Sequence, residues 1–108
     1  MSTKVISVAR DFSPVPAGRH FTDGPFPGAK FRDELLLPAL KAFDDVTIEL
    51  DGTVGMGSSF LEEAFGGLVR LGYSESILRQ RLHIQTSRES YAQRIWDYIG
   101  RARLRSVN

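Results

Sequence analysis

Apolar and polar positions alternate in short stretches that are typical of β-strands. Residues 4–12 are rich in β-branched side chains and are followed by prolines and glycines that end a strand. In residues 46–51 and 82–86 every second side chain is apolar, which is the pattern of a strand covered on one face only. Residues 18–21 are a candidate for a short returning strand. The pattern therefore predicts helices packed mainly on one face of the sheet, because strands buried on both faces would be apolar throughout.

The segments between and after these strands have apolar side chains at helical spacing. Residues 29–43 predict a first helix that is bent at Pro38, and residues 59–71 predict a second. Residues 73–81 predict a turn and a short helical piece. A last helix is expected to begin near Ser87.

The composition fits one small α/β domain that spans residues 1–108. Strands that alternate with helices predict parallel crossovers, and 42% hydrophobic residues are enough for a modest core. The absence of cysteine excludes disulfides and thiolate chemistry. No stretch resembles a signal peptide or the roughly 18 apolar residues of a membrane-spanning helix. We therefore expect a cytoplasmic protein that does not associate with membranes.

The net charge of +1 conceals a separation of charge along the chain. Residues 1–69 have an excess of acidic side chains, whereas residues 70–108 hold 8 arginines against 3 acidic residues. Such a basic end is a candidate for contact with nucleic acid or with an acidic protein. Arginines on a solvated helix face would give the same composition, so that alternative stays open.

A glycine- and serine-rich turn links the second predicted strand to the second predicted helix. Ser58 and Ser59 lie where this helix begins, and Ser59 and Glu62 have the spacing of a capping box. Because the N-terminus of a helix favours negative charge, Gly57, Ser58 and Ser59 are candidates for an anion site or for phosphorylation. A capped helix without any ligand is the alternative.

The second helix contains a pair of glycines, which costs roughly 1 kcal/mol per residue relative to alanine. The pair is expected to let another helix or the sheet approach closely, and the alternative is a groove for a partner chain. The residues of this helix that are candidates for partner binding are Phe60, Glu62, Glu63, Gly66, Gly67 and Arg70.

Three blocks of the chain resemble the STAS-like domain family, a bacterial and phage-associated group of uncharacterised function. The blocks are GRHFTDGPFPGAKFRDELLLPAL, VTIELDGTVGMGSSFLEEAFGGLVR and LHIQT, and the resemblance covers about residues 17–86. It implies a mixed β-sheet of about four strands, as in the anti-sigma factor antagonists. In those antagonists a partner kinase phosphorylates a serine or threonine at the start of a helix that also docks the kinase. Carried over, this role falls on Ser58 and Ser59, with residues 60–67 as the docking helix and a histidine-kinase-like ATPase as the implied partner.

Two functions of different classes follow from these features. The first is a non-enzymatic regulatory module that binds a protein partner through the helix starting at Ser59, under the control of serine phosphorylation or anion binding. The alternative is a nucleic-acid-associated accessory protein that uses the arginine-rich C-terminal region.

An enzyme is the weakest hypothesis for this sequence. Neither a P-loop nor a dinucleotide fingerprint fits the glycines near the serine pair, because the spacing differs and no lysine follows. His20 and His83 do not have metal-ligand spacing with acidic residues, so we expect no catalytic residue, cofactor or metal. Arg19, Asp23 and Gly24 are candidates for a small anion pocket, formed if their loop folds toward the serines.

Overall fold

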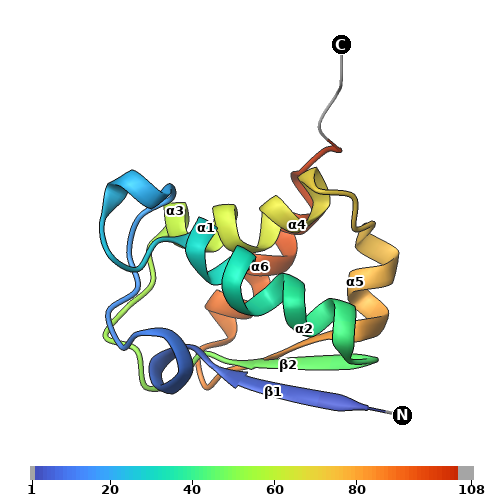
Figure 1. Cartoon of the computed structure of the whole chain (residues 1–108), viewed down its shortest axis with the longest axis horizontal. Coiled ribbons are helices and arrows are strands. Elements are labelled where there is room, and N and C mark those ends of the chain that lie inside the picture. Colours follow the sequence, from blue (N-terminus) through green and yellow to red (C-terminus); the bar gives the residue numbers. More distant parts are fainter. Residues whose placement is uncertain (1, 105–108) are drawn as a thin grey trace.

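A small parallel sheet forms one layer of the molecule (Figure 1). The computed structural model describes residues 2–104. The strands are β1 (Thr3–Ser7), β2 (Asp45–Glu49) and β3 (Leu82–Gln85), arranged in the order β1-β2-β3. The predicted α/β class is confirmed, but the predicted fourth strand is not: within residues 2–104 the sheet has three strands, and it is parallel rather than mixed.

The residues predicted as a returning strand form a tight turn instead. Phe21–Asp23 is a 3₁₀ turn, η2. The Asp23 carboxylate accepts hydrogen bonds from the backbone N–H groups of His20 at 2.8 Å and Arg19 at 3.1 Å. Because these donors are used locally, they do not take part in a strand ladder.

The first strand ends at Ser7, earlier than predicted. The Asp11 carboxylate accepts a hydrogen bond from the N–H of Ser7 at 2.8 Å, and the hydroxyl of Ser7 accepts one from the N–H of Arg10 at 3.1 Å. These two contacts start the π-helical turn η1 (Val8–Phe12), which takes the chain out of the sheet.

Two long helices, a short helix and a last helix complete the fold. Residues 28–42 form α1 (Gly28–Phe31), the π-helical turn η3 (Arg32–Leu36) and α2 (Leu37–Ala42) without a break. Residues 58–70 form α3 (Ser58–Leu61), the π-helical turn η4 (Glu62–Gly66) and α4 (Gly67–Arg70), followed by α5 (Glu75–Arg81) and α6 (Glu89–Arg101). Pro38 lies in the first turn of α2, directly after the irregular turn η3.

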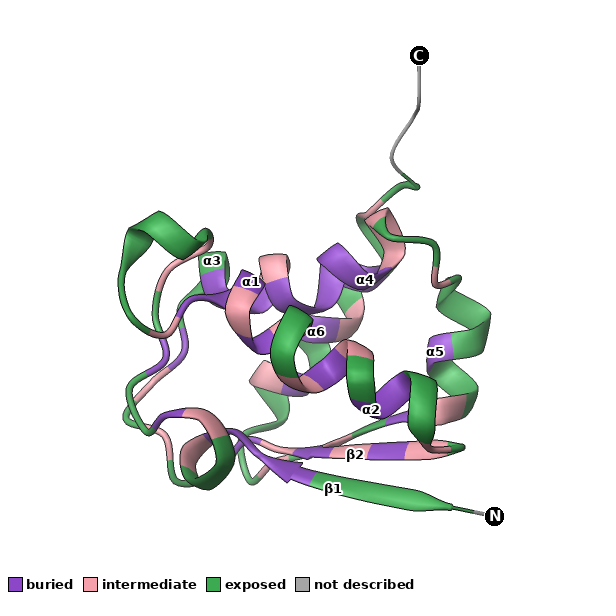
Figure 2. Cartoon of the chain, in the orientation of Figure 1, coloured by how far each residue is buried: buried purple, intermediate pink, exposed green. Residues whose placement is uncertain are grey.

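The helices lie on one side of the sheet, as the alternating strands predict (Figure 1). In β2, Val46 and Ile48 are fully buried beneath the helices, whereas Thr47 and Glu49 on the other face are only half-buried (Figure 2). The core between the two layers is aromatic and aliphatic, and its largest side chains include Phe31, Phe60, Phe65, Leu36, Leu40, Leu61 and Leu68.

One arginine ties the end of the first long helix to the start of β3. Arg81 donates from Nη2 to the carbonyl of Phe43 at 2.7 Å and to that of Leu40, and from Nε to the carbonyl of Asp44 at 3.0 Å. The last carbonyl groups of a helix have no hydrogen-bond donor within the helix, and the helix dipole favours a positive charge near them. The Arg81 guanidinium supplies both the donors and the charge. Arg81 is therefore a structural residue, although composition alone assigns it to the basic end.

We expect Arg81→Ala to lower the free energy of unfolding by about 2 kcal/mol, since it removes charged hydrogen bonds to half-buried carbonyls. Urea denaturation followed by circular dichroism measures this change. Arg10→Ala is the matched control, because the Arg10 side chain is exposed and lies 3.8 Å from Glu49, so its loss should cost less than about 0.5 kcal/mol. Equal losses for the two variants would contradict the role given to Arg81.

Candidate functional site

Gly57, Ser58 and Ser59, which we call the serine turn, start the second long helix at the carboxyl end of β2. Ser58 and Ser59 are exposed, whereas the next residue, Phe60, is fully buried. Gly57 is the N-cap residue, with extended backbone angles of φ −76° and ψ 164°. The helix thus begins at Ser58, one residue before the predicted start.

The predicted capping box of Ser59 and Glu62 is wrong. Ser59 lies inside the first turn, and the N-cap position belongs to Gly57, which has no side chain to form a cap. The Glu62 carboxylate instead accepts hydrogen bonds from the guanidinium groups of Arg70 and Arg19. Charge-assisted bonds of this kind are stronger than a bond from one backbone N–H group, which explains the outcome.

Two loops border the serine turn, residues 13–27 and residues 50–57 (Figure 1). Their backbones are joined where the N–H of Val54 donates to the carbonyl of Pro14 at 2.8 Å. Val54 and Val15 are exposed, with 82% and 55% of their surface accessible to solvent. This end of the molecule therefore offers two exposed apolar side chains on adjoining backbone segments as well as the two serine hydroxyls.

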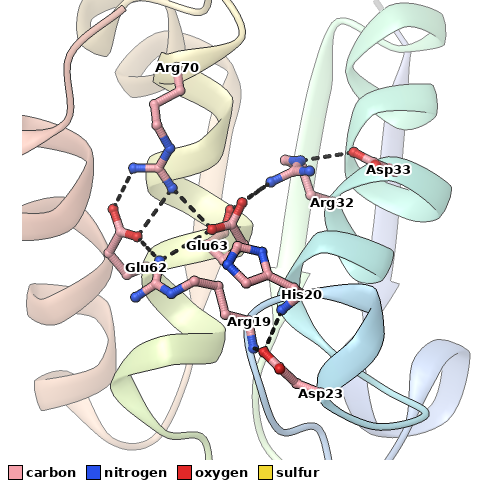
Figure 3. Close-up of polar contacts among 8 residues, drawn as sticks. All are labelled: Arg19, His20, Asp23, Arg32, Asp33, Glu62, Glu63 and Arg70. Carbon is pink, nitrogen blue, oxygen red and sulfur yellow. Dashed lines mark hydrogen bonds and ion pairs between the residues drawn. The ribbon is translucent and has the colours of Figure 1, made fainter. Parts of the chain in front are cut away.

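Five charged side chains gather one turn further along the helix (Figure 3). We call Arg19, Arg32, Glu62, Glu63 and Arg70 the charged cluster. Arg32 Nη1 lies 2.5 Å from Glu63 Oε2, and Arg70 Nη1 lies 2.7 Å from Glu62 Oε2. Arg19 Nη1 contacts both carboxylates, at 3.2 Å from Glu63 Oε1. The cluster thereby joins the loop 13–27 and both long helices.

The glycine pair makes room for this cluster. A Cβ atom on Gly66 would lie 2.6 Å from Oε2 of Glu62, and a Cβ atom on Gly67 would lie 2.6 Å from Nη1 of Arg32. The atoms nearest to the pair are therefore charged side chains, Glu62 of the same helix and Arg32 of the first long helix. The two helix backbones come close at another glycine, Gly28, whose added Cβ would lie 2.5 Å from the carbonyl oxygen of Phe60.

Both glutamates of the cluster are held in the ionised form. The hydrogen bonds from Arg70, and with them those from Arg19, lower the pKa of Glu62 below its usual 4.5, although burial opposes them. Burial raises the pKa of Glu63, but the hydrogen bonds from Arg32 and Arg19 and the charge of Arg70 outweigh it, so that this pKa is also lowered. The cluster is therefore fully charged at neutral pH.

The predicted partner-binding residues divide into buried and half-buried groups. Phe60, Gly66 and Gly67 are buried within the domain, so they do not reach the surface. The other three, Glu62, Glu63 and Arg70, are half-buried and bound to one another in the charged cluster. The serine turn itself, in contrast, is exposed.

The anion pocket predicted from Arg19, Asp23 and Gly24 is not formed by these residues. Arg19 does fold against the helix that follows the serine turn, but its guanidinium binds Glu62 and Glu63. The Asp23 carboxylate accepts backbone hydrogen bonds, chiefly from His20, and these lower its pKa. The Arg19 guanidinium, which would have to bind the anion, is thus already paired with two carboxylates.

A small pocket at the carboxyl ends of β2 and β3 was not predicted from the sequence. It has a volume of about 320 Å³ and is lined by residues 50–54 and by Ser87, Arg88 and Tyr91. Asp51 accepts hydrogen bonds at Oδ1 from the N–H of Ser87 at 2.9 Å and from its hydroxyl at 3.0 Å, and these bonds lower the pKa of Asp51. Asp51 therefore holds the start of α6. Only the order of the strands brings these residues together.

Histidines do not form a metal site in the structure. His83 is exposed, and its Nε2 lies 3.1 Å from Oδ1 of Asp45. Residues 2–104 contain no group of three or more His, Asp or Glu side chains arranged to hold a metal ion.

The arginines of the basic end are largely engaged in local contacts. Arg79 pairs with Glu75 at 3.1 Å, Arg81 binds helix-end carbonyls, and Arg101 pairs with an acidic residue one turn before it. Arg105 lies outside the described residues. Local neutralisation of this kind reduces the positive charge that nucleic acid would meet.

Comparison with known families agrees with the α/β fold. The family described as "STAS-like domain of unknown function (DUF4325)" matches residues 27–92, more than half of the chain. The chain belongs to this family. Comparisons with curated proteins and with solved structures found no match.

The matched part of the STAS-like domain includes the serine turn, the glycine pair and all of the charged cluster except Arg19. Arg19 precedes the matched residues, so the family model does not cover the contact between the loop 13–27 and the charged cluster. Among the described helices of the domain, none has the length and apolar character needed to cross a bilayer.

Proposed function

We propose that this STAS-like domain is a non-enzymatic regulatory module that binds a protein partner at the serine turn and the two loops beside it. The main support is that Ser58 and Ser59 are exposed at the start of a helix whose apolar residues are buried. The hydroxyl of Ser59 does not have the capping role that the sequence suggests, and both serines are exposed, so a modifying enzyme or a partner can reach them. Val15 and Val54 supply apolar contact area nearby.

Phosphorylation of Ser58 or Ser59 is the proposed control of this binding. A phosphoserine carries roughly 1.5 to 2 negative charges at neutral pH. Glu62 follows Ser58 by four residues, and Glu63 follows Ser59 by four, so each pair lies on one face of the helix. A phosphate at either serine would repel these carboxylates and compete with them for Arg19.

Arg19 gives this competition a route to the neighbouring loop. It belongs to residues 13–27, the same loop that carries the exposed Val15. If Arg19 moves from the glutamates toward a phosphate, the loop loses its contact with the charged cluster. The proposed binding surface would then change its shape as well as its charge.

A histidine-kinase-like ATPase is the first candidate for the partner, following the resemblance to anti-sigma factor antagonists. Purified candidate, ATP and the domain can be incubated together, and mass spectrometry then locates any phosphate. Nucleic-acid binding is not a second proposal, because the pairing of Arg79 and Arg101 with acidic residues counts against it.

We expect Ser58→Asp or Ser59→Asp to change partner affinity by about tenfold or more, equivalent to about 1.4 kcal/mol. The partner for this test is chosen as a protein that binds the wild-type chain but does not bind the surface variant Val54→Arg. Calorimetry then measures the affinity of this partner for each serine variant. Ser58→Ala and Ser59→Ala separate loss of the hydroxyl from gain of charge. Ser76→Asp, an exposed serine on α5, is the control and should leave affinity within about twofold. Unchanged affinity in all four serine-turn variants would refute the switch.

A further inference from the structure

A groove of about 1140 Å³ lies beside the last helix, and its lining does not include the serine turn. It is lined by α6, by Glu75 and Arg79 of α5 and by Ile84 of β3. β3 is the last strand in the order β1-β2-β3, and no residue among 2–104 pairs with its outer edge. A neighbouring chain can therefore approach this side without displacing part of the described domain.

α6 presents a charged side to this groove. Two fully buried side chains of α6, Ile95 and Ile99, belong to the opposite side of the helix, which packs against η4. The charged residues of α6 that line the groove are Glu89, Arg94, Asp97 and Arg101. They are exposed, and their charges sum to zero. Net repulsion therefore does not oppose contact between two copies of this surface.

The order of these charges is self-complementary. Along α6 they read negative, positive, negative, positive, and they are placed almost symmetrically about residue 95. In an antiparallel pair of α6 helices, Glu89 of one copy faces Arg101 of the other, and Arg94 faces Asp97. A parallel pair would bring like charges together. A two-fold axis between copies produces the antiparallel arrangement, since the same patch then meets itself in reverse.

An aromatic residue lies near the middle of this pattern. Trp96 is half-buried, lines the groove, and has the guanidinium of Arg79 at 4.5 Å from its ring centroid. Tryptophan and arginine near the centre of a surface are the residues that most often dominate binding energy. The symmetric charges on α6 would surround this central pair.

We propose that the groove beside α6 is a self-association surface, in which a second copy of the chain places its α6 antiparallel to the first across a two-fold axis. The contact brings Glu89 beside Arg101 and Arg94 beside Asp97 of the other copy, and it adds to the ion pair that Asp97 and Arg101 form within each chain. Trp96 lies near the axis. The contact is independent of the serine turn, so a dimer formed here leaves both serine turns exposed.

A charge swap in the full-length chain tests this proposal. Sedimentation velocity over a wide range of concentrations should detect a dimer of the wild type that weakens at high salt. Arg101→Glu and Glu89→Arg should each weaken the dimer by at least about tenfold, because each places like charges opposite one another. The double variant E89R/R101E should restore it, since the opposed signs are re-established.

Trp96 provides a second measurement on the same samples. It is the single tryptophan of the chain, so its fluorescence emission should shift to shorter wavelength as the dimer forms. Lys41→Glu, a charge reversal at an exposed residue of α2, is the matched control and should leave association unchanged. Circular dichroism melting of each variant shows that it is folded. A monomer at every concentration, or a dimer that ignores the charge swap, would overturn the proposal.

Discussion

Gly28→Ala is expected to lower the free energy of unfolding by about 3 kcal/mol, at the upper end of what overpacking costs. The added Cβ would lie 2.5 Å from the carbonyl oxygen of Phe60 and 3.1 Å from the amide nitrogen of Ala64. Both of these atoms are backbone, so no side chain can rotate away to relieve the contact. The two long helices would have to separate, which opens the core around the fully buried Phe31 and Phe60. Urea denaturation at neutral pH measures the loss.

Gly55→Ala is the control for this result. Nothing lies within 4 Å of a Cβ at Gly55, and the backbone angle φ there is not positive. Alanine should therefore leave stability within about 0.5 kcal/mol or raise it slightly, because it restricts the unfolded chain. A loss at Gly28 no larger than at Gly55 would show that the two helices are not as close as described.

The strands that alternate in sequence were predicted well, because one covered face imposes a period of two. β2 and β3 begin and end within two residues of the predicted bounds. β1 is shorter than its β-branched pattern, because Asp11 accepts the hydrogen bond of the Ser7 N–H group. Propensity describes each residue by itself, whereas this strand end depends on a side chain four residues away.

Exposure of the serine turn agrees with the sequence-based interpretation, but its chemical surroundings do not. The sequence assigns Glu62 to a cap because the local spacing allows it. In the structure Glu62 is bound by Arg70 on the next turns of the helix and by Arg19 from a distant loop. Contacts between residues 43 apart cannot be read from local spacing. The glycine pair in the sequence indicates that another group lies close to the helix. It does not indicate that this group is the set of charged side chains of Glu62 and Arg32.

Glu63→Ala is expected to lower the free energy of unfolding at neutral pH by roughly 2 to 3 kcal/mol, near the lower bound for breaking a buried ion pair. Glu63 Oε2 lies 2.5 Å from Nη1 of Arg32, and both side chains have only 12% of their surface exposed. Removing the carboxylate leaves the Arg32 guanidinium beside Gly67 without this partner. Glu75→Ala is the control, because Glu75 and Arg79 are both exposed and their pair should be worth about 0.5 kcal/mol or less.

The same variant should change the dependence of stability on pH. Burial raises the pKa of Glu63, but the bonds to Arg32 and Arg19 outweigh it, so the folded-state pKa is below the ordinary 4.5. A lowered pKa means that the unfolded chain binds more protons in acid, so stability rises with pH in this range. The contribution of Glu63 is fully present above about pH 5 and is lost as the pH falls through the folded-state pKa. Urea denaturation from neutral pH into acid should therefore show wild type and Glu63→Ala converging as the pH falls. If the difference between them stays constant, the charge of Glu63 is not what stabilises the fold, and the contribution comes from packing alone.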